Sequence, residues 1–152
     1  MEFFARSREW RGSGAKCEKI RVLGSCEMQG KGILVVDDDA GMCELLKLVF
    51  SREGAQVFTA GGGHEGLLQF SACRPDLVIL DIMMPKVDGW QLCTEIRELA
   101  DVPIIFLSAL RGEDEIVRGL ELGAADYVTK PFEAKVLVAR ARAFLRQVAP
   151  AV

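Results

Sequence analysis

Polar side chains follow four apolar runs of the sequence, each at the point where the run ends. They are three consecutive acids, Asp37, Asp38 and Asp39, and then Asp81, Ser108 and Lys130. Crowded carboxylates repel one another unless they share a cation, and their hard oxygen atoms favour Mg²⁺. Lys130 would supply a point charge for a phosphate or for Asp81, and the hydroxyl of Ser108 could donate to a phosphoryl oxygen. These residue types predict a divalent-cation site that handles phosphate.

A carboxylate is the only competent nucleophile in this set. The single histidine of the sequence, His64, follows a different run, so histidine-based triads and zinc sites lack their material. An aspartate can itself accept a phosphoryl group. The glycines at 61–63 resemble a phosphate-binding loop, but they lack the GxxxxGK[ST] and GxGxxG patterns, which argues against nucleotide binding.

Five strands alternating with five helices are predicted to position these side chains. The strands are expected at 33–36, 57–59, 77–81, 104–107 and 127–129, and the helices at 42–50, 64–72, 88–99, 113–122 and 133–148. Short loops between alternating elements predict right-handed crossovers and a doubly wound, five-stranded parallel sheet with helices on both faces, a three-layer α/β domain. Because the carboxyl ends of parallel strands meet at one edge, the polar residues should converge there.

Each of these residues also has a purely structural interpretation. An aspartate after a strand is commonly a helix N-cap, and we expect that role for Asp88, whereas Asp39 is expected to be a charge at a helix start. His64 is expected on the surface at a helix start. Independent caps would not all collect at one sheet edge, however, so the coincidence favours a functional site.

Length and composition fit one globular domain. The chain has 152 residues, half of them hydrophobic, and its net charge of -3 combines a basic start with an acidic remainder, which argues against a nucleic-acid surface. Residues 1–31 show no period and are expected to be a disordered extension, with Met28 as an alternative natural start. Residues 32–148 form the expected domain, and 149–152 a C-terminal end or truncated linker. No run suits a signal peptide or a membrane span, so we expect a cytoplasmic protein.

Five cysteines, an odd number without a CxxC pair, argue against a disulfide framework or a zinc site. We expect reduced thiols. Cys43, Cys73 and Cys93 fall on helical segments and are expected to act as small buried hydrophobic residues.

Four separated motifs, ILVVDDD, PDLVILDIMMPKVDG, IIFLSA and DYVTKPF, together resemble the receiver domain of bacterial two-component response regulators, from about Gly32 to Val148. The segment GLELGAADYVTKPFEAKVLVARARAFLR is most similar to receivers that precede a winged-helix DNA-binding domain. The resemblance implies a flavodoxin-like receiver fold. It also implies the following roles: Asp81 accepts the phosphoryl group, Asp37, Asp38, Asp81 and the backbone carbonyl of Met83 bind Mg²⁺, Ser108 and Lys130 contact the phosphoryl group, Tyr127 is an aromatic rotamer switch, and Lys130-Pro131 is a cis peptide.

The implied partner is a sensor histidine kinase or a histidine phosphotransfer protein, and the implied role is a signalling switch that assists its own phosphorylation rather than a metabolic enzyme. Output would pass through the face formed by the segments 113–122, 127–129 and 133–148, with no direct contact to nucleic acid or membrane. Receivers of the winged-helix subfamily dimerise through that face, where Asp126 and Arg140 match one ion pair. Ile116 and Val136 replace charges there, and Gln147 replaces a basic residue, so we expect a weakened dimer and an apolar patch.

Two other functions remain open. An aspartyl-phosphate phosphatase would need a second acid two residues beyond the nucleophile, where this sequence has Met83. A receiver-like module that binds partners without phosphorylation would not need the intact set of acids. In the receiver reading, the apolar Met83 and Leu110 flank the approach of water to the phosphoaspartate, which predicts slow self-dephosphorylation.

Overall fold

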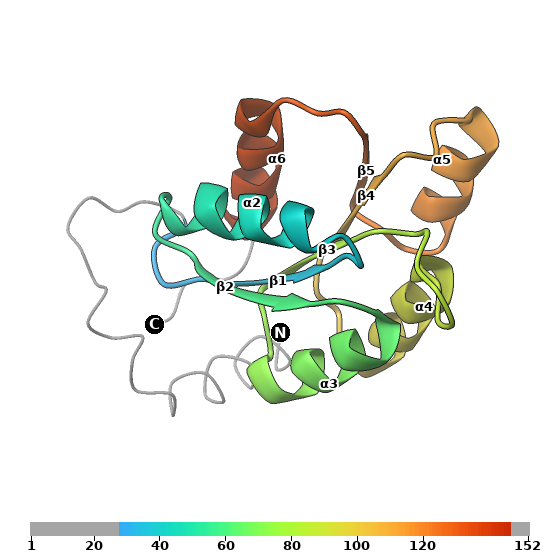
Figure 1. Ribbon diagram of the computed structural model, residues 1–152, viewed down its shortest axis with the longest axis horizontal. Coiled ribbons are helices and arrows are strands. Elements are labelled where there is room, and N and C mark those ends of the chain that lie inside the picture. The colour runs from blue at the N-terminus through green and yellow to red at the C-terminus, as the bar shows by residue number, and fades with distance from the viewer. Residues whose placement is uncertain (1–27, 147–152) are drawn as a thin grey trace.

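The computed structural model describes residues 28–146, so most of the predicted extension and the last six residues lie outside the described part of the chain (Figure 1). The strands are β1 (Gly32–Val36), β2 (Gln56–Ala60), β3 (Leu77–Leu80), β4 (Ile104–Ser108) and β5 (Asp126–Thr129). The helices are α2 (Ala40–Ser51), α3 (Gly63–Cys73), α4 (Gly89–Leu99), α5 (Glu113–Glu121) and α6 (Ala134–Arg146). All ten elements agree with the predicted ones to within two residues at most ends.

The five strands form one parallel sheet in the order β2-β1-β3-β4-β5. The sheet therefore has its topological switch point between β1 and β3, which are neighbours although β2 separates them in sequence. Their register pairs Val36 with Leu80, the last residue of each strand. The next residues, Asp37 and Asp81, consequently leave the sheet side by side. The prediction of a doubly wound α/β fold is confirmed.

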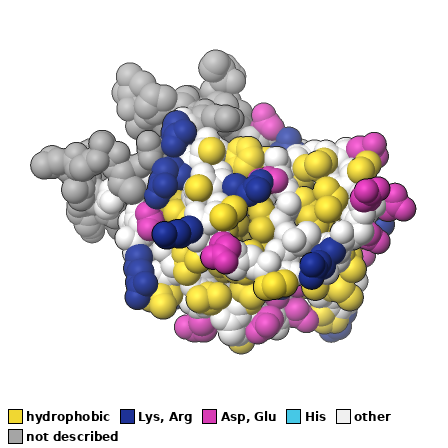
Figure 2. All heavy atoms as spheres, turned by 90° about the horizontal axis from the view of Figure 1, so that it is seen from above, with side chains coloured by type: hydrophobic (Ala, Val, Ile, Leu, Met, Phe, Trp, Pro, Cys, Tyr) yellow, Lys and Arg dark blue, Asp and Glu magenta, His cyan; other side chains and the backbone are white. Residues whose placement is uncertain are grey.

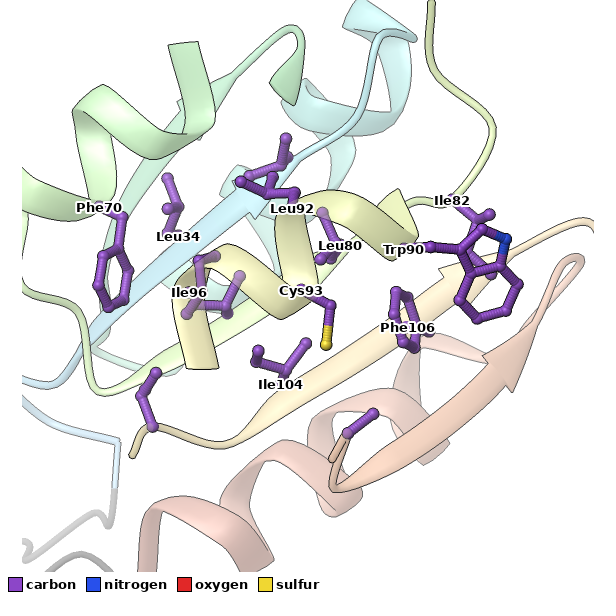
Figure 3. Packing of buried hydrophobic residues seen from close by; sticks show 14 of the residues in the cluster. Leu34, Phe70, Leu80, Ile82, Trp90, Leu92, Cys93, Ile96, Ile104 and Phe106 are labelled. Atoms are coloured by element: carbon purple, nitrogen blue, oxygen red, sulfur yellow. The ribbon is translucent and has the colours of Figure 1, made fainter. Parts of the chain in front are cut away.

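The sheet separates two apolar cores. Alternate residues of each strand point to opposite faces: Leu34 and Val36 enter a core with α3 and α4, whereas Ile33 and Val35 enter a core with α2 and α6. Figure 1 shows α2 and α6 on one side of the sheet and α3 and α4 on the other. Figure 3 shows the first of these cores, in which side chains of α4 pack on β3 and β4. Both faces of β1, β3 and β4 are buried, which explains their continuous apolar sequence.

Two aspartates begin helices, as predicted. The side chain of Asp39 accepts hydrogen bonds from the amides of Gly41 and Met42 at the start of α2. The side chain of Asp88 accepts from the amide of Gln91 at the start of α4. Each carboxylate satisfies helix-end amides that have no intrahelical partner.

Two leucines, Leu45 on α2 and Leu99 on α4, are exposed. Leu45 is 44% exposed because α2 turns Cys43, Leu46 and Phe50 toward the core, and Leu45 lies one residue, about 100°, off that line. Leu99 is 57% exposed because it is the last residue of α4 and the chain becomes extended at Ala100.

The three described cysteines are free thiols. Cys43 and Cys93 are buried as predicted, whereas Cys73 is only half-buried, because it is the last residue of α3. His64 is exposed near the start of α3, also as predicted.

Figure 2 shows the face that carries α2 and α6, on which basic, acidic and hydrophobic side chains are interspersed. Within residues 28–146, the structure contains no helix that is both long and apolar enough to cross a membrane.

Candidate functional site

Three aspartates meet at the carboxyl edge of the sheet. Asp37 and Asp38 follow β1 and Asp81 follows β3, and one oxygen from each lies within 4.8 Å of the other two. Asp37 and Asp81 are buried, whereas Asp38 is exposed at the mouth of the site. The sequence-based prediction that these acids converge is confirmed.

The two buried acids are partly satisfied by local amides and by one ammonium. Asp37 accepts a hydrogen bond from the amide of Asp39 at 2.9 Å, and Asp81 accepts one from the amide of Ile82 at 2.7 Å. Lys130, which follows β5, donates to Asp37 Oδ2 at 2.9 Å, and its Nζ lies 3.6 Å from Asp81 Oδ2. One lysine thus serves two carboxylates.

This arrangement shifts the proton affinities of its members. Burial raises the pKa of Asp81, and the neighbouring charge of Asp37 raises it further, while Lys130 and the amides of Ile82 and Met83 act in the opposite direction. Burial opposes the charge of Lys130, yet its pKa is raised because Asp37 and Asp81 both stabilise the ammonium. The site is therefore short of positive charge, which favours a bound cation.

The donor set fits a hard divalent cation. The three carboxylates offer oxygen atoms close together, two of them in a buried environment and one open to solvent, the ligand type that Mg²⁺ prefers. Met83 lies in the loop after Asp81 with its side chain 58% exposed. The role of its backbone carbonyl as a further ligand stays a prediction.

Ser108 and Tyr127 both form hydrogen bonds with the backbone of the same loop residue, Leu110. Ser108, the last residue of β4, is completely buried, and its Oγ accepts a hydrogen bond from the amide of Leu110 at 3.2 Å. Tyr127 on β5 is turned inward, and its hydroxyl donates to the carbonyl of Leu110 at 2.7 Å. Burial raises the pKa of Tyr127, with smaller contributions from the charges of Glu115 and Asp81.

Several contributors to the site are backbone groups that the sequence could not identify. The amides of Asp39 and Ile82 and the carbonyl of Leu110 fall in this class, and every residue type carries such groups. Gly89 did have a signal, because Asp88-Gly89 follows the loop after Asp81. A Cβ at Gly89 would collide with the carbonyl oxygen of Asp81. The predicted cis peptide at Lys130-Pro131 is present.

Comparison with known proteins matches this architecture. The family model for the response regulator receiver domain matches residues 33–142. A "Probable transcriptional regulator ycf27" of Cyanophora paradoxa is 48% identical over 121 residues, which cover 80% of this chain and 51% of that protein. The chain thus spans about half the length of such relatives.

Two solved structures are similar to this one. A two-component response regulator from Clostridium difficile has a TM-score of 0.76 at 29% identity, covering 79% of this chain and 99% of that chain. The BeF3-activated N-terminal receiver domain of RstA from Klebsiella pneumoniae has a TM-score of 0.74 at 34% identity, covering 76% and 99%.

Proposed function

The chain belongs to the family of response regulator receiver domains, and from this membership we propose that Asp81 is the phosphoacceptor of a two-component signalling switch. The observation that carries the proposal is the convergence of Asp37, Asp81 and Lys130 at the carboxyl ends of neighbouring strands. A buried carboxylate beside a second carboxylate and one ammonium is both a nucleophile and part of a cation site.

The phosphoryl donor in this proposal is a phosphohistidine of a sensor kinase or of a phosphotransfer protein. A carboxylate oxygen of Asp81 attacks phosphorus, the P–O bond forms as the P–N bond breaks, and the imidazole nitrogen retains the electron pair. The amide of Ile82 orients the carboxylate by holding Oδ1. Lys130 Nζ lies 3.6 Å from Asp81 Oδ2, close enough to form a charge-assisted hydrogen bond to an oxygen atom of the transferred phosphoryl group.

Mg²⁺ would be held by Asp37, Asp38, Asp81 and the Met83 carbonyl, and it would supply the charge neutralisation that phosphoryl transfer requires. Asp37 and Asp81 share a single ammonium, that of Lys130, so their negative charge is only partly balanced. The raised pKa of Asp81, which reflects burial and the repulsion of Asp37, supports this assignment. Exposed Asp38 gives the site an opening to solvent.

Phosphorylation would bias a two-state equilibrium through Ser108 and Tyr127. A Ser108 hydroxyl that turns to the phosphoryl group would release the amide of Leu110, and the carbonyl of the same residue holds Tyr127. The proposed output surface is formed by α5, β5 and α6. Its exposed apolar residues are Val117, Leu120 and Val136. Ile116 is partly buried and packs against the first core, so its contribution to this patch stays a prediction.

The domain is a signalling domain of a family whose named relatives include transcriptional regulators. We place it in the cytoplasm, where a kinase partner could reach it. The phosphatase alternative lacks its second acid, since position 83 is a methionine. A phosphorylation-independent module would gain nothing from two buried acids that lie against one lysine.

Incubation with acetyl phosphate and Mg²⁺, followed by intact-mass measurement, tests the proposal. The parent protein should gain the mass of one phosphoryl group, whereas Asp81→Asn should gain none and should keep its fold. Asp114→Asn, which removes an exposed carboxylate of α5, is the matched control and should label like the parent. Labelling of the Asp81→Asn variant at the parent's rate would disprove the assignment.

A further inference from the structure

A row of three buried aromatic rings connects β5, β4 and α4. The ring of Tyr127 on β5 lies 5.9 Å from that of Phe106 on β4, and Phe106 lies 5.3 Å from Trp90 on α4, both in tilted arrangements. Figure 3 shows Trp90 and Phe106 side by side at the end of the first core. Tilted pairs at these distances are favourable beyond simple burial. A movement of Tyr127 would change its packing on Phe106, which in turn packs on Trp90.

Helix α5 rests on this row through two consecutive residues. Gly119 is the one buried residue of α5, and a Cβ there would lie 2.9 Å from Tyr127 and 3.0 Å from Phe106. Only a glycine lets the helix approach both rings this closely. Arg118 places its guanidinium 4.4 Å from the centre of the Trp90 ring, a cation–π contact that links α5 to α4.

The surroundings leave α5 few other attachments to α4. A surface hollow between the two helices is lined by Asp88, Trp90, Gln91, Thr94, Arg118 and Leu122. Val117 and Leu120, which flank Arg118 and Gly119 in the sequence, are 50% and 45% exposed. Helix α5 therefore contacts the rest of the domain at Gly119, at partly buried Ile116 and through the Arg118–Trp90 contact.

We infer that Trp90 and Arg118 are positioning residues of the switch: by stacking, they hold α5 on Phe106 and Tyr127 and so favour the conformation in which Tyr127 is turned inward. This inference rests on the proposed function, because it assumes that the inward conformation is the one phosphorylation stabilises. A contact that favours the competent conformation raises the apparent affinity of any ligand that selects it.

If the Arg118–Trp90 contact had only a structural role, its removal would change global unfolding and not the response of α5 to a phosphoryl analogue. Arg118 is exposed, so removal of its guanidinium should barely change the global stability of the domain. A positioning role should instead change the exchange of α5 amides and the response to a phosphoryl analogue. The two roles are separated by comparing global unfolding with these local readouts.

The experiment uses the full chain. Arg118→Met removes the charge, and Arg111→Met is the matched control, since Arg111 is exposed in the loop before α5 and lies outside the aromatic row. Trp90→Leu removes the ring, while Trp90→Phe keeps an aromatic face. The readouts are amide hydrogen exchange of α5 without ligand, the beryllofluoride concentration that gives half-maximal protection of α5 in Mg²⁺, and the thermal unfolding midpoint.

Arg118→Met should accelerate α5 exchange and raise the half-maximal beryllofluoride concentration by roughly two- to fivefold, the range that an exposed cation–π contact supports. Its unfolding midpoint should match that of Arg111→Met. Trp90→Leu should show the same local defects, and Trp90→Phe should restore most of the response.

Equal behaviour of Arg118→Met and Arg111→Met in the local readouts would overturn the inference, as would exchange that rises uniformly over the whole domain. Failure of the proposed function is separate, because it would appear as a parent protein that neither labels with acetyl phosphate nor responds to beryllofluoride. In that case α5 exchange without ligand would still decide whether Arg118 seats the helix.

Discussion

Lys130 donates its hydrogen bond to Asp37 rather than to the proposed phosphoacceptor Asp81, with which it forms a longer ion pair. The distance from Nζ is 2.9 Å to Asp37 Oδ2 and 3.6 Å to Asp81 Oδ2. The lysine therefore occupies, without metal, part of the charge-balancing role that a divalent cation would take. A cation on Asp37 would free Lys130 to move toward the oxygen atoms of a phosphoryl group on Asp81.

Lys130→Met should destabilise the metal-free domain most strongly at neutral pH. The pKa of Asp81 is already raised by burial and by Asp37, and Lys130 is a counteracting influence, so its loss should raise that pKa further. A raised carboxyl pKa means that stability is greatest below the ordinary value of 3.8 and is lost as pH rises through the folded-state value. We expect a deficit of about 1–2 kcal/mol near neutral pH that shrinks toward about pH 4.

Thermal or urea unfolding at several pH values measures this deficit. Lys47→Met, which removes an exposed lysine of α2, is the matched control and should show little loss at any pH. A Lys130→Met deficit that is independent of pH would contradict the role of Lys130 as a shared counterion.

Gly89→Ala should destabilise the domain by about 3 kcal/mol, an overpacking cost at the upper end of the usual range. The added Cβ would lie 2.6 Å from the Cα of Ile82 and against the carbonyl of Asp81, and backbone cannot yield as a flexible side chain can. Gly61→Ala is the control, because its nearest neighbour is a Glu65 carboxylate oxygen at 3.7 Å. Denaturant midpoints would decide, and equal stability of the two variants would show that the loop after Asp81 can shift freely.

The sequence predicted the strands and their terminal acids because both signals are local: a continuous apolar run and the residue type that follows it. Asp39 and Asp88 were predictable for the same reason, since an N-cap needs only one short polar side chain before a helix. The aromatic row was not predictable, because Trp90, Phe106 and Tyr127 come from three elements far apart in the chain. Nor was the choice of partner by Lys130, which depends on distances between loops.

We predict that activation gives at most a weak dimer through α5, β5 and α6. Asp126 and Arg140, the residues that match an intersubunit ion pair, bind one another within the molecule at 2.8 Å, with Arg140 about half exposed. Sedimentation of beryllofluoride-treated protein should show mainly monomer, and Arg140→Glu should leave that distribution unchanged. A tight dimer that Arg140→Glu disrupts would refute the prediction.

The phosphorylated state is predicted to be long-lived because Met83 and Leu110 offer water no hydrogen bond. Met83→Asn combined with Leu110→Gln should accelerate decay by at least about tenfold, since a polar side chain could orient the attacking water. The hydrogen bonds of Leu110 use its backbone, so they survive this change.

Decay of the phosphorylated mass peak after donor removal, with Mg²⁺ kept, is the measurement. Leu120→Gln on exposed α5 is the control. Loss within seconds in the parent, or no acceleration in the double variant, would exclude this control of water access.

In the native protein, Cys93 should resist thiol reagents even at pH values well above its ordinary pKa. Burial raises that pKa from 9.0 to about 11, and Arg97 offsets the rise only in part. Because the folded-state pKa is raised, the stability that the neutral thiol contributes is present below pH 9.0 and is lost as pH rises toward about 11. Alkylation followed by peptide mapping should show half-buried Cys73 modified before Cys93. Early modification of Cys93 at mildly alkaline pH would show that α4 opens locally.

The register that pairs Val36 with Leu80 limits which sequence changes the fold can tolerate. Inserting one residue into β1 or β3 would move its terminal acid past its neighbour and turn alternate side chains to the opposite core. Substitution within these strands keeps that alignment as long as the new residue is apolar and of similar size. Length variation between related chains should therefore be confined to loops such as the one between α4 and β4, at the edge of the sheet away from the acids. The lengths of β1 and β3 should therefore vary less between related chains than the residue types within them.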